Sequence, residues 1–206
     1  MPLNSRLLGD VVKYVERQFG DESGVQITED DIIRWTNQGL MEITSKNKVL
    51  RASASTVSVG GTSTYSKPDD CLQMTAVSYD GRLLKGIGFD EFQNIYTVDV
   101  QDEVCHWSMY GDSIILGATP SDSDKTILIY YIPEPQHVAD LSTVLPIPDR
   151  YFNVLCEFVM SKAYELDEDW TAHNTQRQLF EDNLSVAGHA ETVMTGPYPV
   201  VIDYDY

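Results

Sequence analysis

The chain has 206 residues and is strongly acidic, with 32 Asp and Glu against 14 Lys and Arg and a formal charge of -18. A surface that binds DNA or RNA needs clustered Lys and Arg, and here these residues are few and scattered between Arg6 and Arg177, which argues against such a surface. Hydrophobic residues make up 42% of the chain, enough for a packed core, and the length suits one domain with an insertion.

The N-terminal part of the chain predicts a pair of helices within about residues 4–47. Apolar residues recur at helical spacing as far as Phe19, with Asn4 or Ser5 available as the N-cap. A break bounded by glycines follows. Thr28 can then cap a second helix, whose first turn is acidic and therefore favoured by the helix dipole.

The middle of the chain, about residues 50–132, changes to short stretches rich in Val, Thr, Ser and Tyr that are typical of antiparallel strands. Turns that pair Gly with Asp at 80–81 and 111–112 indicate hairpins, and a short helix is predicted at 90–96. We expect the strands to pair in sequence order as a meander. The predicted strands are 57–59, 63–66, 72–79, 107–110, 113–116 and 126–132.

Four prolines between residues 133 and 148 then indicate an irregular crossover, because proline cannot donate to a strand ladder or sit inside a helix. Helices resume at Asp149 and continue to about residue 187. The first carries a wide apolar stripe, and Asp169 can cap the second. Gly188 is predicted to end the packed part.

The last ten residues, 197–206, differ from the rest. Two prolines disfavour a helix, while Val200, Ile202, Tyr204 and Tyr206 fall at period two, as in a strand. This predicts an extended arm with no obvious strand partner in the chain. The alternative is a disordered terminus.

No signature of catalysis, metal binding or cofactor binding occurs, and we therefore expect no enzyme, no metal and no cofactor. The zinc-protease, nucleophile-elbow, phosphate-loop and dinucleotide-turn patterns are all absent. The carboxylates at 165–169 are more simply an exposed helix junction than an acid and base pair, and the run 121–125 a hairpin tip rather than a calcium loop. The three cysteines are expected to be reduced and mostly buried: Cys71, Cys105 and Cys156.

No apolar run approaches the length of a membrane span, and the first residues lack the basic and apolar regions of a signal peptide. We therefore expect a protein that stays in the cytoplasm, without membrane contact.

The order of helix pair, strand-rich insertion, proline crossover, helix pair and extended tail resembles the head-to-tail adaptor (connector) proteins of tailed bacteriophages. The resemblance covers most of the chain, and it rests on the order of several segments because none of them is a catalytic signature. These segments are Asp31–Ile43, Gly111–Leu116 with Thr119-Pro120, Ile129–Pro133 and Leu145–Phe152.

The resemblance implies an α+β fold: a helical bundle built from the two helix pairs, with an inserted antiparallel β-rich region, in a single adaptor domain at 1–196. It also implies a component of the virion that forms a ring of twelve copies beneath the portal protein and offers a platform for tail or nozzle proteins. DNA would pass through the ring without specific binding, because carboxylates along a lumen repel the phosphate backbone.

The extended arm at 197–206 gains a role from the same resemblance. Adaptor C-termini of this family can extend into the portal, where an exposed sheet edge would accept the arm as an added strand. The residues implied in portal binding are Tyr198, Val200, Val201, Ile202, Tyr204 and Tyr206.

Three other functions stay open on the sequence. A tail-tube or gatekeeper component of the same virion would share the acidity and the strand-rich texture. A carbohydrate-binding or receptor-binding module would use Trp107, Tyr110 and the strands as a stacking platform. An enzyme of unrecognised type would need a cleft whose residues give no motif.

Overall fold

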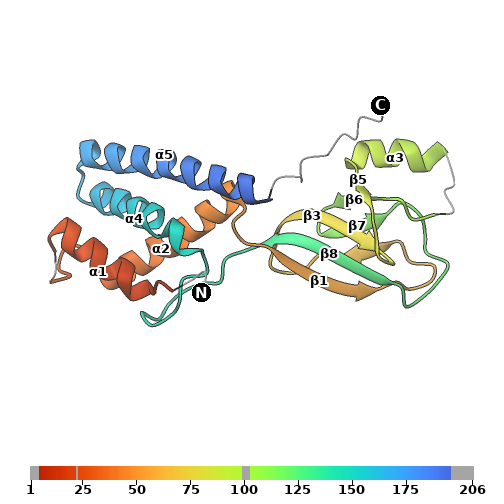
Figure 1. Cartoon of the computed structure of the whole chain (residues 1–206), viewed down its shortest axis with the longest axis horizontal. Helices are drawn as coiled ribbons and strands as arrows, with labels where there is room; N and C mark the ends of the chain where they lie inside the picture. The colour runs from red at the N-terminus through yellow and green to blue at the C-terminus, as the bar shows by residue number, and fades with distance from the viewer. Residues whose placement is uncertain (1–4, 22, 99–102, 196–206) are drawn as a thin grey trace, which may run out of the picture. The chain divides into compact units, whose positions relative to one another are not determined.

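The computed structural model describes residues 5–21, 23–98 and 103–195. The chain divides into two compact units, one formed by residues 1–49 with 135–206 and the other by residues 50–134. We call them the helical unit and the sandwich unit (Figure 1). The mixture of helices and strands confirms the predicted α+β composition. The sandwich unit is inserted in sequence between the helix pairs.

The helical unit is built around α4, which has few exposed residues. Nine of its residues are buried, because the helix is apolar around most of its circumference, and it packs against α1, α2 and α5. Helices occur in both parts of the sequence where they were predicted, and Thr28 caps α2. The elements are α1 (Leu8–Phe19), α2 (Glu29–Asn47), the 3-10 turn η1 (Asp149–Tyr151), α4 (Phe152–Leu166) and α5 (Trp170–Thr195).

Two glycines allow helices to approach closely in this unit. A Cβ added at Gly39 of α2 would lie 2.7 Å from Leu155 Cδ1 and 2.8 Å from Phe158 Cδ1 of α4. A Cβ at Gly188 of α5 would lie 2.9 Å from Asn47 Nδ2. The predicted helix end at about residue 187 is therefore corrected: α5 continues to Thr195, and Gly188 lies within it at a close approach to Asn47.

The first residues of the unit are tied to the start of the C-terminal helices. Asp149 accepts hydrogen bonds from the backbone N–H groups of Ser5 (2.7 Å) and Arg6 (3.2 Å) and from the Ser5 hydroxyl. Ser5 is therefore not the N-cap of α1. That place belongs to Leu7, whose N–H donates to Asp10 Oδ2 at 3.0 Å. A partner 144 residues away overrides the local cap signal.

The described strands of the sandwich unit form two sheets of four strands, in the orders β1-β8-β3-β4 and β2-β7-β6-β5. The predicted meander is wrong, since the last strand lies between β1 and β3 and since β5 and β6 are parallel. β8 carries the buried residues Ile127, Ile129 and Tyr131 on one face, toward the core, whereas Tyr130 on the opposite face is 40% exposed. The elements are β1 (Ala52–Val57), β2 (Thr64–Ser66), β3 (Cys71–Tyr79), β4 (Arg82–Leu83), β5 (Lys85–Gly86), α3 (Phe89–Val98), β6 (His106–Tyr110), β7 (Ser113–Leu116) and β8 (Thr126–Pro133).

The two sheets share one apolar core, which is what makes this unit a sandwich. Val77 and Ile129 of one sheet belong to the same buried cluster as Ile114 and Leu116 of the other. The predicted hairpin turn at 80–81 is confirmed, with positive φ angles of 48° at Asp80 and 81° at Gly81.

Two local expectations in this unit are corrected. The first strand covers Ala52–Val57 rather than 57–59, and Ser58 just beyond it is buried. The Ser58 hydroxyl donates to the Asp122 carbonyl at 2.8 Å and accepts from the Lys125 N–H at 3.0 Å. Residues 121–125 are consequently not a hairpin tip, because they connect β7 of one sheet to β8 of the other.

Candidate interaction surfaces

The described residues hold no group of three or more His, Cys, Asp or Glu side chains that could bind a metal ion. Among the same residues, no helix is both long and apolar enough to cross a membrane. Cys156 is fully buried in α4, and burial raises the pKa of its thiol, which suits a core residue rather than a nucleophile. Asp169 caps α5 as predicted, since its carboxylate accepts from the N–H groups of Thr171 (3.1 Å) and Ala172 (3.0 Å).

The aromatic residues considered for a stacking platform do not share one surface. Trp107 belongs to the sandwich core, and a Cβ added at Gly86 would lie 3.1 Å from its indole ring. Tyr110 is 64% exposed and instead packs against Phe89, with ring centroids 4.5 Å apart. A sugar ring therefore finds no pair of exposed faces at these two residues.

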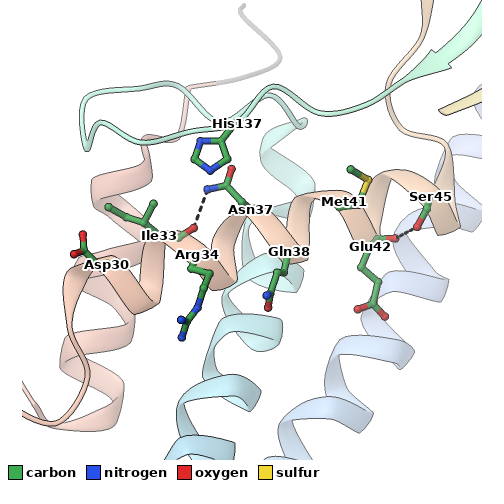
Figure 2. Close-up of a pocket in the computed structure, with 9 residues that line it drawn as sticks. All are labelled: Asp30, Ile33, Arg34, Asn37, Gln38, Met41, Glu42, Ser45 and His137. Atoms are coloured by element: carbon green, nitrogen blue, oxygen red, sulfur yellow. Dashed lines mark hydrogen bonds between the residues drawn. The ribbon is translucent and has the colours of Figure 1, made fainter. Parts of the chain in front are cut away.

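An open groove of about 710 Å³ runs along α2 (Figure 2). Its apolar floor comes from Ile33 and Met41, which are half-buried, and its rim is polar and charged. Figure 2 shows most of the lining side chains following the helix, with His137 reaching in from the crossover segment. The lining residues are Asp30, Ile33, Arg34, Asn37, Gln38, Met41, Glu42, Ser45 and His137.

Asn37 fixes the wall of the α2 groove. Its side-chain amide donates to the Val138 carbonyl at 2.8 Å and to the Ile33 carbonyl at 2.9 Å, and its oxygen accepts from the Val138 N–H at 2.9 Å. One side chain thus satisfies both backbone groups of Val138. The groove is shaped before any partner arrives, which lowers the entropy cost of binding.

An ionic cluster joins α2 to α5 beside this groove. Lys46 lies 2.9 Å from Glu42 and 2.7 Å from Glu181, while Arg177 contacts both carboxylates, at 2.8 Å for Glu181. Arg177 also lies over the ring of Phe180, 4.8 Å from its centroid. Partial burial would raise the pKa of Glu42, but hydrogen bonds from Arg177 and Lys46 outweigh burial, so the pKa is lowered.

A second groove, of about 330 Å³, follows the exposed side of α1. Three cations face it, and the guanidinium of Arg6 lies 4.7 Å from the ring centroid of Phe152. This surface is not predicted from the sequence, in which the basic residues are few and scattered. The spacing of Lys13 and Arg17, one helical turn apart, is the signal that could have found it. The lining residues are Arg6, Asp10, Lys13, Tyr14, Arg17, Gln18 and Phe152.

The residues implied in portal binding lie outside the described part of the chain, so their placement stays a prediction. They are Tyr198, Val200, Val201, Ile202, Tyr204 and Tyr206.

Comparison with known proteins gives a match to one family model. The model is that of the SU10 adaptor protein family, a phage head-to-tail adaptor family, and it matches residues 6–199. No curated protein matches the chain. The family match covers nearly the whole of both units. The chain therefore belongs to the SU10 adaptor protein family.

Proposed function

We propose that the protein forms a ring of twelve copies beneath the portal of a tailed phage, where it attaches the tail and leaves a passage for DNA. The observation that carries the proposal is the family match over residues 6–199, since it includes the helical unit and the sandwich unit together. An adaptor of this family is a structural part of the virion that contacts portal and tail components. The portal and tail or nozzle proteins are accordingly the partners we assign.

The helical unit is the body of the proposed ring. Its helices are joined by close packing at Gly39, by the Asn37 clamp and by the cluster around Glu42, all of which resist shear. The sandwich unit is inserted in sequence between two helices and supplies a separate contact surface, as segments that connect the elements of a rigid scaffold often do.

The acidity suits a passage for DNA. The helical unit has 20 acidic and 9 basic residues, and the sandwich unit has 12 and 5, so both units are negatively charged. Carboxylates that face a lumen repel phosphates and prevent the counterion release on which DNA binding depends. DNA then moves through without being held.

For the arm at 197–206 we propose docking on the portal as an added strand. The support is the alternation of Val200, Ile202, Tyr204 and Tyr206 in a segment with two prolines. Removing residues 196–206 is expected to leave a soluble folded protein that no longer joins portal-bearing heads. If heads acquire the shortened chain as well as the full chain, the arm does not bind the portal.

The ring itself is tested by electron microscopy of particles that carry the tagged protein. The expected result is density for twelve copies between portal and tail. The purified chain alone should be largely monomeric by mass measurement in dilute solution at physiological salt, because the portal acts as the template. Density in the tail tube, or away from the tail axis, would contradict the adaptor function.

A further inference from the structure

The α1 groove holds three cations that form no ion pair with the described residues of the helical unit, although the charge of Arg6 also acts on nearby Asp149. Four other cations of this unit make ion pairs with carboxylates of the same unit: Arg34, Lys46, Lys162 and Arg177. By contrast Arg6, Lys13 and Arg17 make no ion pair with any described residue, although they all line one groove. In a unit where acids outnumber bases by about two to one, three cations without an ion pair among the described residues therefore gather in one groove, while Lys48 lies elsewhere.

Three cations and one carboxylate, that of Asp10, line the groove, so its lining carries a net positive charge that suits negatively charged groups. Lys13 and Arg17 are exposed and one helical turn apart, so their charged ends lie on the same side of α1. Arg6 is held over the Phe152 ring, while Tyr14 adds a partly exposed aromatic surface. A partner that presents carboxylates at a similar spacing would pair with all three cations.

A surface of matching charge lies at the end of the same unit, where the loop between α1 and α2 meets the turn between α4 and α5. Gln26 donates to Asp167 across this junction, and the rings of Phe19 and Tyr164 pack with centroids 5.5 Å apart. Three exposed carboxylates lie near it without a side-chain partner among the described residues: Glu29, Asp30 and Glu168. We call these three residues the acidic end.

We infer that the α1 groove of one copy binds the acidic end of a neighbouring copy; this inference rests on the proposed ring. Neighbours in a ring meet through two different surfaces, which fits a groove and an end that differ in charge. Copies that each carry a charge of -18 repel one another, and such a pairing offsets part of the repulsion where they meet.

Duplex DNA fits the groove less well than a second copy does. DNA carries about one negative charge per 1.7 Å of its length, so it would extend from a groove with three cations over acidic surroundings. The acidic end is a short surface. Its charges can meet the cations without bringing a long run of phosphates against other carboxylates.

Cross-linking with a carbodiimide tests the contact directly, because this reagent joins a Lys amine to a carboxylate in contact with it. The full chain, mixed as unlabelled and heavy-nitrogen-labelled copies at low salt, should give mixed-label peptides that link Lys13 to Glu29, Asp30 or Glu168. Lys13→Arg keeps the charge but removes the amine, and should abolish these links. Lys48→Arg, at another exposed lysine without an ion pair among described residues, should leave them unchanged. Absence of mixed-label links at Lys13 would overturn the inference.

Charge reversal gives a second, independent measurement. Lys13→Glu with Arg17→Glu, or Glu29→Lys with Glu168→Lys, should each lower self-association roughly tenfold or more in sedimentation at low salt, since attractive pairs become repulsive. A mixture of the two variants should recover association, because the native groove of the second variant meets the native acidic end of the first. The reversed groove and the reversed end are also opposite in charge. Both double variants alter exposed side chains, and circular dichroism verifies that they fold. Unchanged association, or failure of the mixture to recover it, contradicts the pairing.

Two further outcomes separate this inference from the proposed function. If Lys13→Glu with Arg17→Glu still forms the ring on portal-bearing heads, the groove is not the contact, although the adaptor function stands. If the unmodified chain is absent from the portal vertex, the adaptor function fails whatever the cross-links show. Binding of labelled duplex DNA that disappears in the same variant would assign the groove to DNA and overturn the inference.

Discussion

The helical unit and the sandwich unit are stabilised in different ways. The helical unit combines segments from both ends of the sequence, and polar contacts such as Asp149 with Ser5 and Asn37 with Val138 hold those segments together. The sandwich unit is continuous in sequence, and its first and last strands pair along their length, beginning with Ala52 opposite Tyr131. Because the two ends of the sandwich unit pair in one ladder, its sequence can change without separating the two segments of the helical unit.

The largest effect should come from dividing the chain. Residues 50–134 alone are expected to fold, because both ends are paired and the apolar core lies within the segment. Replacing them by a short Gly/Ser linker should leave a folded helical unit, whereas residues 1–49 alone should be largely unfolded, since α1 and α2 pack on α4. Circular dichroism with thermal melting measures all three. A sandwich segment that unfolds without the helices would show that the units depend on each other.

A substitution at Gly39 should weaken the helical unit alone. Gly39→Val places atoms where Leu155 and Phe158 already lie, and overpacking of this kind costs about 1–3 kcal/mol. Gln38→Val adds the same side chain to the neighbouring exposed position and should cost much less. Chemical denaturation, followed by the circular dichroism of the helices and by tyrosine fluorescence, measures the stability of both variants. Equal losses in the two variants would mean that the close approach of α2 and α4 contributes little to stability.

The ionic cluster offers a smaller test of the same contrast. Arg177→Met leaves the partly buried Glu42 with Lys46 as its remaining cation, and should lower the free energy of unfolding by about 1–2 kcal/mol. The matched variant in the sandwich unit is Arg82→Met, where the pair with Glu103 is exposed and should be worth little. Equal changes in urea unfolding for both variants would contradict the structural importance assigned to the cluster.

The contrast between units also explains which features the sequence could predict. Apolar periodicity over a few helical turns predicts where the helices lie, and local turn chemistry predicts the hairpin at Asp80-Gly81. The pairing of β1 with β8 depends on segments about 70 residues apart, and no local pattern encodes it. The role of Gly188 is also invisible in the local sequence, because this glycine allows a close approach to the side chain of Asn47 on another helix.

Prediction of the site was less complete for the same reason. Sequence could show that catalytic motifs are absent, but the α1 groove requires Phe152 to lie beside Arg6, which is a tertiary contact. The α2 groove likewise depends on the crossover segment, brought to α2 by the two hydrogen bonds between Asn37 and Val138. Both surfaces therefore appear only when the two ends of the chain are folded together.

The smallest expected effect is a change in the acid stability of the helical unit. Because the folded pKa of Glu42 is lowered, its contribution to stability is fully present above the ordinary Glu value of 4.5 and is lost as pH falls through the lower folded value. Arg177→Met removes the main hydrogen-bond donor to Glu42, so the stability of this variant should depend less on pH below 4.5 than that of the unchanged chain. Urea unfolding across that pH range measures the slope, and Arg82→Met provides the control because its pair belongs to the other unit. A slope that is unchanged in Arg177→Met would show that other carboxylates, such as Asp149 with its hydrogen bonds from Ser5, dominate the acid limb.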